Sequence, residues 1–339
     1  MNTIIEEINY TFNVPDKLNN RLTNNNFAFF DIETTGFSRN KSKVILIGLL
    51  YPTTKGVKII QLFANDLKEE KELLYEFINQ IKNFDTLISF NGDTFDIPFL
   101  NDRFIHNSID YKISKDLNLD ILKDVRKNKD ILNLDNCKLK TVEKKLNIYR
   151  EDIINGKESV NLYFKYLKNK DSKIKSTILK HNYDDIYYLP KIMDIYNLID
   201  KESKIGTSII LDNQKASFEI DIKNIKIMEN TLIISGITNK LDFKSQIYYK
   251  DNYTFKWEPQ KGLFQLILSI NKGMLSTGKQ CSYLNQKLYD FPYLLKDSSN
   301  YKLPKELILI KDNKKLIYKN IQSLFVFLIE QIFYNIYDK

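Results

Sequence analysis

The pattern of apolar positions in the first part of the chain predicts β-strands. Residues 27–36 begin with an apolar run, residues 44–50 are nearly all apolar, and residues 57–63 follow Gly56 with strand character. Short runs of this kind, bounded by turn residues, are typical of strands. We therefore expect three antiparallel strands joined as a meander.

A helical period follows these strands. Apolar residues recur every three or four positions between residues 69 and 81, which is the stripe of an amphipathic helix. Residues 86–90 return to strand character, and residues 91–100 leave that strand through a glycine turn and begin another helix. Strands that are followed by a helix and a further strand indicate an α/β domain.

Three later segments also have helical periods. They are residues 119–125, residues 139–146 and a long segment at residues 176–199, which the apolar spacing predicts to be one helix. Residues 119–125 and 139–146 carry mixed charges on their polar faces, which indicates exposure to solvent.

The character of the chain changes after Ile205. Short strand-like runs separated by Asn, Asp and Gly, then a hairpin and a terminal apolar helix, occupy residues 218–222, 231–236, 246–249, 253–257, 263–268, 306–318 and 321–336. The pattern predicts a second, mostly β domain at residues 205–339, after an α/β domain at residues 1–204.

An alternation of aromatic residues marks one strand of this second domain. Tyr253, Phe255 and Trp257 share one face of the predicted strand. Such a face is compatible with a platform on which unpaired bases stack. It is more typical of a sheet face that is turned toward a protein interior.

Composition narrows the class of protein. Apolar residues make up 43% and charged residues 28% of the 339 residues, a globular profile long enough for about two domains. No run of 18 apolar residues occurs, and the N-terminus lacks the basic and apolar regions of a signal peptide. Cys137 and Cys281 cannot form a disulfide framework or a zinc site alone, so we expect a cytoplasmic protein without a membrane span.

Positive charge is concentrated in the second part of the chain. The formal net charge is +8, and residues 205–339 contribute +6 of it through 19 Lys against 13 acidic residues. A basic second domain beside a nearly neutral first one would suit a partner that is a polyanion. A general bias toward lysine on the surface would give the same numbers.

Candidate chemistry begins at the end of the first strand. Asp31 and Glu33 are separated by one residue, so both side chains project from the same face of the strand. Two carboxylates held that close raise each other's pKa unless a cation lies between them. Oxygen ligands of this kind suit a hard divalent cation.

Further acidic residues follow at two other places. Asp96 stands at the start of the helix after the second α/β strand, where it is either a capping residue or a ligand at the end of the sheet. His181 and Asp185 lie four residues apart, on one face of the long helix. Asp120 is an additional candidate for the same acidic cluster.

Three segments together resemble a known family. Residues 31–36 (Asp-Ile-Glu-Thr-Thr-Gly), residues 90–100 (Phe-Asn-Gly-Asp-Thr-Phe-Asp-Ile-Pro-Phe-Leu) and residues 181–189 (His-Asn-Tyr-Asp-Asp-Ile-Tyr-Tyr-Leu) are similar to the three motifs of the DEDD superfamily of RNase H-like 3′–5′ exonucleases. The likeness is greatest to its YprB-type branch, which is related to the proofreading domains of family B polymerases, and covers roughly residues 25–200. Residues 139–143 and 162–166 also resemble segments of that branch.

The resemblance implies a fold, a site and a reaction. Residues 1–204 would form an RNase H-like mixed sheet flanked by helices, and Asp31, Glu33, Asp96 and Asp185 would be the ligands of two Mg²⁺ or Mn²⁺ ions. Such ions stabilise both oxygens of an in-line displacement at phosphorus. The expected activity is release of 5′-mononucleotides from the 3′ end of single-stranded DNA or RNA.

His181 departs from the family's pattern. One DEDD subgroup has a tyrosine four residues before the last acid and another has a histidine five before it, whereas His181 stands at the tyrosine's spacing. The resemblance therefore implies for His181 the role of general base or of a residue that positions water.

Other functions stay open at this level. The same fold supports metal-dependent endonucleases. No feature of the sequence indicates whether a nucleic acid strand can extend past the site on its 3′ side, which is what distinguishes an endonuclease from an exonuclease. A nucleic-acid-binding module without turnover is less compatible with the sequence, because concentrated negative charge repels phosphates. A scaffold whose β domain recruits a partner is a further alternative.

Overall fold

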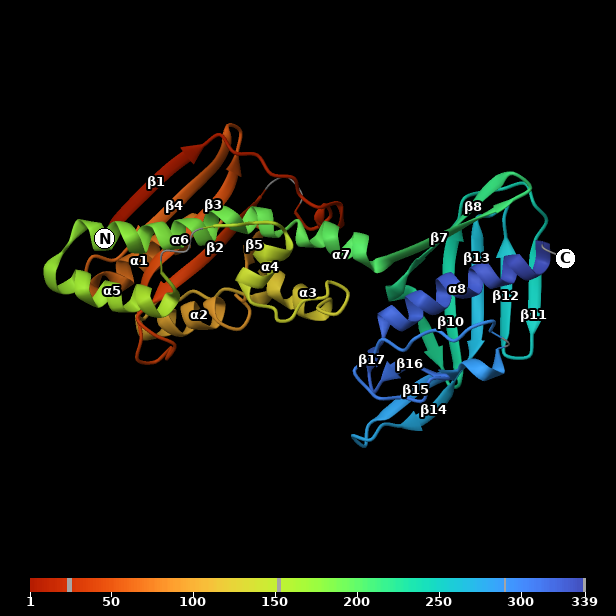
Figure 1. Cartoon of the computed structure of the whole chain (residues 1–339). Coiled ribbons are helices and arrows are strands. Elements are labelled where there is room, and N and C mark those ends of the chain that lie inside the picture. The colour runs from red at the N-terminus through yellow and green to blue at the C-terminus, as the bar shows by residue number, and fades with distance from the viewer. Residues whose placement is uncertain (23–25, 151–153, 290, 338–339) are drawn as a thin grey trace. The chain divides into compact units, whose positions relative to one another are not determined.

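The computed structural model describes residues 1–22, 26–150, 154–289 and 291–337. The chain forms two compact units, Met1–Ile199 and Asp200–Lys339, which are described separately here. Figure 1 shows the α/β character of the first unit and the strand-rich second unit. The expected fold class, an α/β mixed sheet flanked by helices with a mostly β C-terminal region, is confirmed.

A six-stranded mixed sheet forms the centre of the first unit. The strand order is β1-β4-β3-β2-β5-β6. Strands β1 to β4 pair antiparallel, and β5 and β6 extend the sheet in parallel with β2. The strands span β1 Asn2–Ile8, β2 Phe27–Thr34, β3 Val44–Thr53, β4 Gly56–Phe63, β5 Thr86–Ser89 and β6 Asn118–Asp120. The expected meander is thus confirmed.

Helices cover both faces of this sheet. They span α1 Glu70–Ile81, α2 Asp96–His106, α3 Ile121–Lys127, α4 Leu139–Lys145, α5 Gly156–Asn169, α6 Ser172–Ile192 and α7 Ile195–Ser203. Strand alternation directs Ala28 and Phe30 toward α1 and α2, and directs Phe27 and Phe29 toward the face that α6 covers. Asp31 continues the second of these rows, so it lies on the α6 face.

The long helix predicted for residues 176–199 is wrong in its bounds. Helix α6 begins earlier, at Ser172, because the Asp171 side chain accepts a hydrogen bond from the N–H of Lys173. It ends at Ile192, shortly after Pro190, whose ring nitrogen has no hydrogen to continue the helical ladder. The N–H of Met193 donates to the carbonyl of Pro190, a tighter turn that separates α6 from α7.

The second unit consists of antiparallel sheets and one long helix. A seven-stranded sheet has the order β11-β12-β13-β10-β8-β7 with β9 added to β10, and a four-stranded sheet has the order β14-β15-β16-β17. The elements are β7 Lys204–Leu211, β8 Gln214–Asp221, β9 Lys226–Met228, β10 Thr231–Thr238, β11 Gln246–Lys250, β12 Tyr253–Glu258, β13 Leu263–Ser269, β14 Asn271–Met274, β15 Gln280–Asn285, β16 Leu307–Asp312, β17 Lys315–Leu316 and α8 Tyr318–Tyr337.

The aromatic alternation of β12 belongs to the interior of the second unit. Tyr253, Phe255 and Trp257 are all buried, and the ring of Trp257 lies 5.3 Å from that of Phe333 in α8. Helix α8 crosses this sheet in Figure 1. These rings therefore form core contacts and cannot stack on bases, so the platform interpretation is wrong.

The structure also bears on the two cysteines and on membrane-spanning helices. Both Cys137 and Cys281 are free thiols. Within the part of the chain that the structure describes, no helix has the length and apolarity needed to cross a lipid bilayer.

Candidate active site

The end of β2 supplies two acids to the face that α6 covers. Asp31 and Glu33 extend the row of Phe27 and Phe29, so the strand that builds the core also carries both carboxylates to its edge. Glu33 is buried, with 8% of its surface exposed.

Helix α2 adds a third acid next to this pair. Asp96 is the first residue of α2 and is buried, and the N–H of Ile32 in β2 donates to its Oδ1 at 3.3 Å. This bond joins the start of α2 to the backbone between Asp31 and Glu33. Parallel pairing of β5 with β2 brings the start of α2 to this edge of the sheet.

Helix α6 contributes the histidine and the fourth acid. His181 Nε2 lies 3.5 Å from Glu33 Oε1 and 3.8 Å from Asp185 Oδ2. One ligand atom from each of Glu33, His181 and Asp185 lies within 4.8 Å of the other two. Residues that are about 150 positions apart in the chain therefore meet at one place.

A glycine in β3 lets α6 approach the sheet closely. Gly48 pairs with Asp31 on one side and with Gln61 on the other. A β-carbon at Gly48 would lie 2.5 Å from Asn182 Oδ1 and 2.6 Å from Ile186 Cγ1, so only glycine leaves room for the helix.

Asn182 uses this close approach to join α6 to the acids. Its Nδ2 donates to Asp31 Oδ2 at 3.3 Å, and its Oδ1 accepts from Gln61 Nε2 at 3.0 Å. Asn182 is fully buried. Three neighbours across the sheet, Asp31, Gly48 and Gln61, thus fix the distance of α6 from the sheet and its rotation about its own axis. The positions of His181 and Asp185 on α6 are fixed in the same way.

Burial and neighbouring charges raise the pKa of both acids of β2. Burial raises the pKa of Asp31 well above its ordinary value, and the charges of Asp185, Asp96 and Glu33 raise it further. Burial, followed by the charge of Asp185, raises the pKa of Glu33 to about 8, against a lowering by the Ser159 hydroxyl of α5.

Asp96 is shifted in the same direction. Burial raises the pKa of Asp96 to about 7, while hydrogen bonds from backbone N–H groups, including that of Ile32, act against the rise. The charge of Asp120 adds to it. Asp31, Glu33 and Asp96 are thus held in a place that disfavours their charged forms in the absence of a cation.

Asp120 lies beside the cluster but is occupied by backbone donors. It accepts from the N–H groups of Asn91 at 2.8 Å, Asp93 at 3.2 Å and Leu122 at 3.0 Å, the last of which caps α3. It therefore fixes the turn that precedes α2. Like Asp31 and Asp96, it lies outside the group of described residues formed by Glu33, His181 and Asp185, but its oxygens, unlike theirs, accept from three backbone N–H groups.

The donor set fits a hard divalent cation. Asp31, Glu33, Asp96 and Asp185 offer carboxylate oxygens, and His181 offers a ring nitrogen beside them. Oxygen donors of this kind suit Mg²⁺ and Mn²⁺, and a bound cation would favour the charged carboxylates that burial disfavours.

Two further features were not predicted from the sequence. Arg150 Nη2 forms an ion pair with Asp185 Oδ1 at 2.6 Å. Phe37 is 88% exposed, and its ring lies 6.2 Å from that of Phe95, which directly precedes Asp96. A solvent-exposed phenylalanine beside a buried acidic cluster leaves an apolar surface at the edge of the site.

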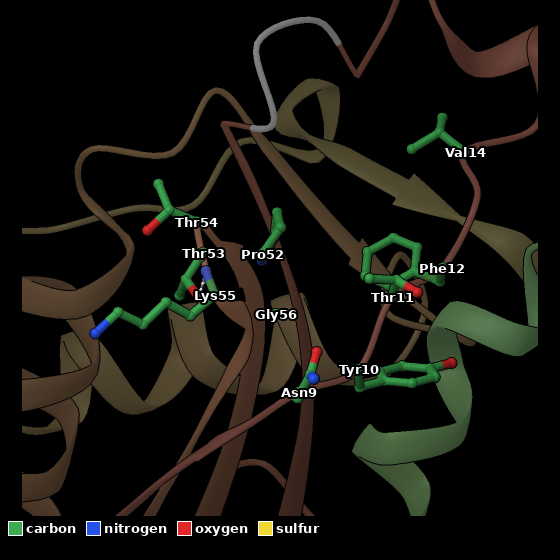
Figure 2. Close-up of a pocket in the computed structure, with 10 residues that line it drawn as sticks. All are labelled: Asn9, Tyr10, Thr11, Phe12, Val14, Pro52, Thr53, Thr54, Lys55 and Gly56. Atoms are coloured by element: carbon green, nitrogen blue, oxygen red, sulfur yellow. Dashed lines mark hydrogen bonds between the residues drawn. The ribbon is translucent and has the colours of Figure 1, made fainter.

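The pocket in Figure 2 is a different place on the same unit. It has a volume of about 530 Å³ and lies between residues 9–14 and the turn joining β3 to β4. Among the described residues that line it there is no carboxylate, and Lys55 is the one basic side chain. None of the five candidate residues reaches it, so it cannot hold the cation that the acids would bind.

These pKa shifts predict how stability depends on pH. A carboxyl group whose folded-state pKa is raised binds more protons in the folded chain than in the unfolded one, so the unfolding free energy falls as pH rises. For Glu33 and Asp96 this window runs from about pH 4 to about pH 8. We expect the melting temperature of metal-free protein to fall across it.

Added Mg²⁺ should reverse this fall. Because the cation favours the charged carboxylates, Mg²⁺ should raise the melting temperature at pH 8 much more than at pH 5. Thermal unfolding with chelator and with Mg²⁺ measures both effects, and Glu33→Gln should weaken both. A melting temperature that changes neither with pH between pH 5 and pH 8 nor on addition of Mg²⁺ would contradict the electrostatic account.

Comparisons with solved structures give distant likenesses. The chain is similar to the family B DNA polymerase of Pyrobaculum calidifontis (14% identity, TM-score 0.37) over 51% of this chain and 24% of the polymerase. It is similar to E. coli exonuclease I in complex with a dT13 oligonucleotide (12%, 0.30) over 61% of this chain and 54% of that one. It is similar to the Aedes aegypti Nibbler EXO domain (16%, 0.33) over 55% of this chain and 83% of that domain.

These likenesses are partial in length. The chain covers about a quarter of the polymerase and about half of exonuclease I. No curated protein matches the chain.

A comparison with sequence families identifies the first unit. The profile of the RNase H superfamily matches residues 28–197, half of the chain, and these residues contain all five candidate site residues. The RNase H-like part of the resemblance drawn from the motifs is thereby confirmed. The chain belongs to the RNase H superfamily.

Proposed function

We propose that this protein is a DEDD-type 3′–5′ exonuclease of the YprB-like branch, which releases 5′-mononucleotides from single-stranded DNA or RNA. Residues 1–204 would be the exonuclease domain, and residues 205–339 a second domain of another role. The observation that carries the proposal is the convergence of Asp31, Glu33, Asp96 and Asp185, which come from three distant elements. Glu33 and Asp96 are buried, which disfavours a purely structural role, because buried charged groups without a cation destabilise the fold.

The four acids would hold two Mg²⁺ or Mn²⁺ ions. When bound, such ions supply positive charge to the scissile phosphate and to the oxygens that attack and leave it. The chain's own part is to hold the ligands rigidly. Asn182 fixes Asp31, the N–H of Ile32 fixes Asp96, and the close packing of α6 at Gly48 fixes Asp185.

His181 is placed to accept a proton. Its Nε2 faces Glu33 and Asp185 from the middle of α6 at 3.5 Å and 3.8 Å, and its side chain is 13% exposed. A water at the mouth of the acidic cluster would lie within reach of this nitrogen. We assign to His181 the role of general base toward the attacking water.

The exposed ring of Phe37, which packs on the partly buried Phe95, supports a nucleobase as part of the substrate. Phe37 follows the β2 acids by four residues, and Phe95 stands directly before Asp96. Aromatic faces stack on unpaired bases without regard to sequence. A terminal base on Phe37 would place the adjoining phosphodiester toward the carboxylates.

The direct test follows product length. Single-stranded and duplex DNA and RNA, labelled at the 5′ end, are incubated with Mg²⁺ or Mn²⁺ and the full chain. The proposal expects labelled products that shorten stepwise from the 3′ end, together with released 5′-mononucleotides. Internal cuts would assign an endonuclease, and binding without hydrolysis under every condition would assign a non-catalytic module. Either result overturns the proposal.

Replacing His181 by alanine tests the proton acceptor. General bases contribute about 10²–10⁴ to rate, so His181→Ala should reduce the hydrolysis rate by about that factor. The four acids remain, so Mn²⁺ binding measured by calorimetry should change little. His106→Ala is the matched control, because His106 is the other histidine of the chain and lies exposed at the end of α2. An undiminished rate in His181→Ala would remove histidine from the mechanism.

A further inference from the structure

A buried arginine connects the fourth acid to a helix outside the motifs. Arg150 Nη2 lies 2.6 Å from Asp185 Oδ1, and Arg150 Nε lies 3.0 Å from Glu143 Oε1 of α4, so the guanidinium forms an ion pair with each carboxylate. The side chains of Arg150 and Glu143 are only 6% and 5% exposed. The guanidinium also lies 5.9 Å from the ring of Tyr188, one turn beyond Asp185 on α6.

These contacts fix the direction of the Asp185 carboxylate. Oδ1 is turned to Arg150, whereas Oδ2 is turned to His181, 3.8 Å away, on the side where Glu33 lies. A planar guanidinium has its N–H groups at fixed angles, so an arginine held by Glu143 and Tyr188 can orient a second carboxylate. Asp185 is therefore presented to the acidic cluster by one oxygen.

The charge of Arg150 is balanced locally. A lone guanidinium next to Asp185 would oppose the binding of a cation. Glu143 offsets this charge at 3.0 Å, so the Glu143–Arg150 pair brings a guanidinium group to Asp185 with little net charge. This arrangement suits orientation of a ligand better than competition with a metal ion.

We propose that Glu143 and Arg150 are positioning residues that orient Asp185 as a ligand for a divalent cation. The inference rests on the proposed function for the identity of that cation and extends it to two residues outside the four acids and His181. Hydrogen-bond partners of ligating carboxylates typically contribute 10- to 100-fold to metal affinity. We expect a loss of that size when Arg150 is removed.

The test measures Mn²⁺ binding by titration calorimetry on the full chain without nucleic acid. Arg150→Met should bind Mn²⁺ about 10- to 100-fold more weakly than wild type. Arg150→Lys keeps the charge but lacks the planar fork, so it should restore little of the affinity. Lys127→Met is the matched control, because it removes one positive charge from an exposed ion pair with Asp124 and should leave the affinity unchanged.

A second variant separates orientation from folding. Arg150→Met leaves Glu143 buried without its arginine, which can prevent folding. The double variant Glu143→Gln/Arg150→Met removes both charges, should melt cooperatively, and should still bind Mn²⁺ weakly. Unchanged or tighter Mn²⁺ binding in a folded Arg150 variant would overturn the inference.

The two proposals fail in different ways. If wild type binds Mn²⁺ and hydrolyses no nucleic acid, while Arg150→Met loses affinity, the proposed function fails and the positioning role stands. If wild type degrades single strands, while Arg150→Met keeps full Mn²⁺ affinity, the positioning role fails alone. Absence of Mn²⁺ binding by wild type would overturn both.

Discussion

Replacing Asp31 by asparagine is expected to reduce metal-dependent hydrolysis of single-stranded nucleic acid by at least about 1,000-fold. Asp31 is the acid on which the charges of Asp185, Asp96 and Glu33 all act, so it lies where those residues converge. Loss of a ligand oxygen there removes several kcal/mol of transition-state stabilisation, and about 4 kcal/mol corresponds to that factor. The initial rate of nucleotide release at saturating Mg²⁺ measures it.

The stability of the same variant separates a functional role from a structural one. Because burial and neighbouring charges disfavour the charged carboxylate, Asp31→Asn should raise the melting temperature of metal-free protein at pH 8 and abolish its response to Mg²⁺. Asp184→Asn is the control, since Asp184 pairs with Lys180 on the same helix. Normal turnover by Asp31→Asn, or a loss of stability without loss of activity, would contradict the assignment.

Replacing Gly48 by alanine is expected to reduce activity about 100-fold although Gly48 carries no functional group. The new methyl group would overlap Asn182 and Ile186, so α6 must move away from the sheet, and His181 and Asp185 move with it. A displacement near 1 Å at reacting groups costs about 10²-fold in rate. Overpacking should also lower the unfolding free energy by about 1–3 kcal/mol.

Another glycine provides the control for this substitution. Gly156 begins α5, and a β-carbon there would meet nothing within 4 Å. Gly156→Ala should therefore leave activity unchanged and leave stability the same or slightly higher. Steady-state rates and chemical denaturation of both variants measure the difference. Full activity of Gly48→Ala would show that the close approach of α6 is unnecessary.

Strong periodic segments of the fold were predictable, and weakly patterned ones were not. The apolar runs of β2 and β3 and the stripe of α1 are buried on the faces that their periods indicate. Strand β1 was not predicted, because it lies at the edge of its sheet and its residues are mostly exposed. Strand β7 was not predicted either. It is also an edge strand, most of its residues are at least partly exposed, and it lies close to the start of the second unit.

In the candidate site, too, some residues were predictable from the sequence and others were not. The acids follow motifs with a local spacing. Glu33 and Asp185 meet at His181, and Asp31 lies within range of the charges of Asp185, Asp96 and Glu33. The groups that hold them in place have no such signal. Asn182 meets Gln61 across 121 residues of sequence, and a buried arginine such as Arg150 cannot be matched to its carboxylates without the fold.

Anomalous scattering from crystals of the full chain grown with Mn²⁺ tests the central claim most directly. The account predicts manganese contacted by carboxylate oxygens of Asp31, Glu33, Asp96 and Asp185, and loss of that signal in Asp31→Asn. Manganese bound elsewhere on the molecule, with these four carboxylates free of metal at millimolar Mn²⁺ and pH 8, would contradict it.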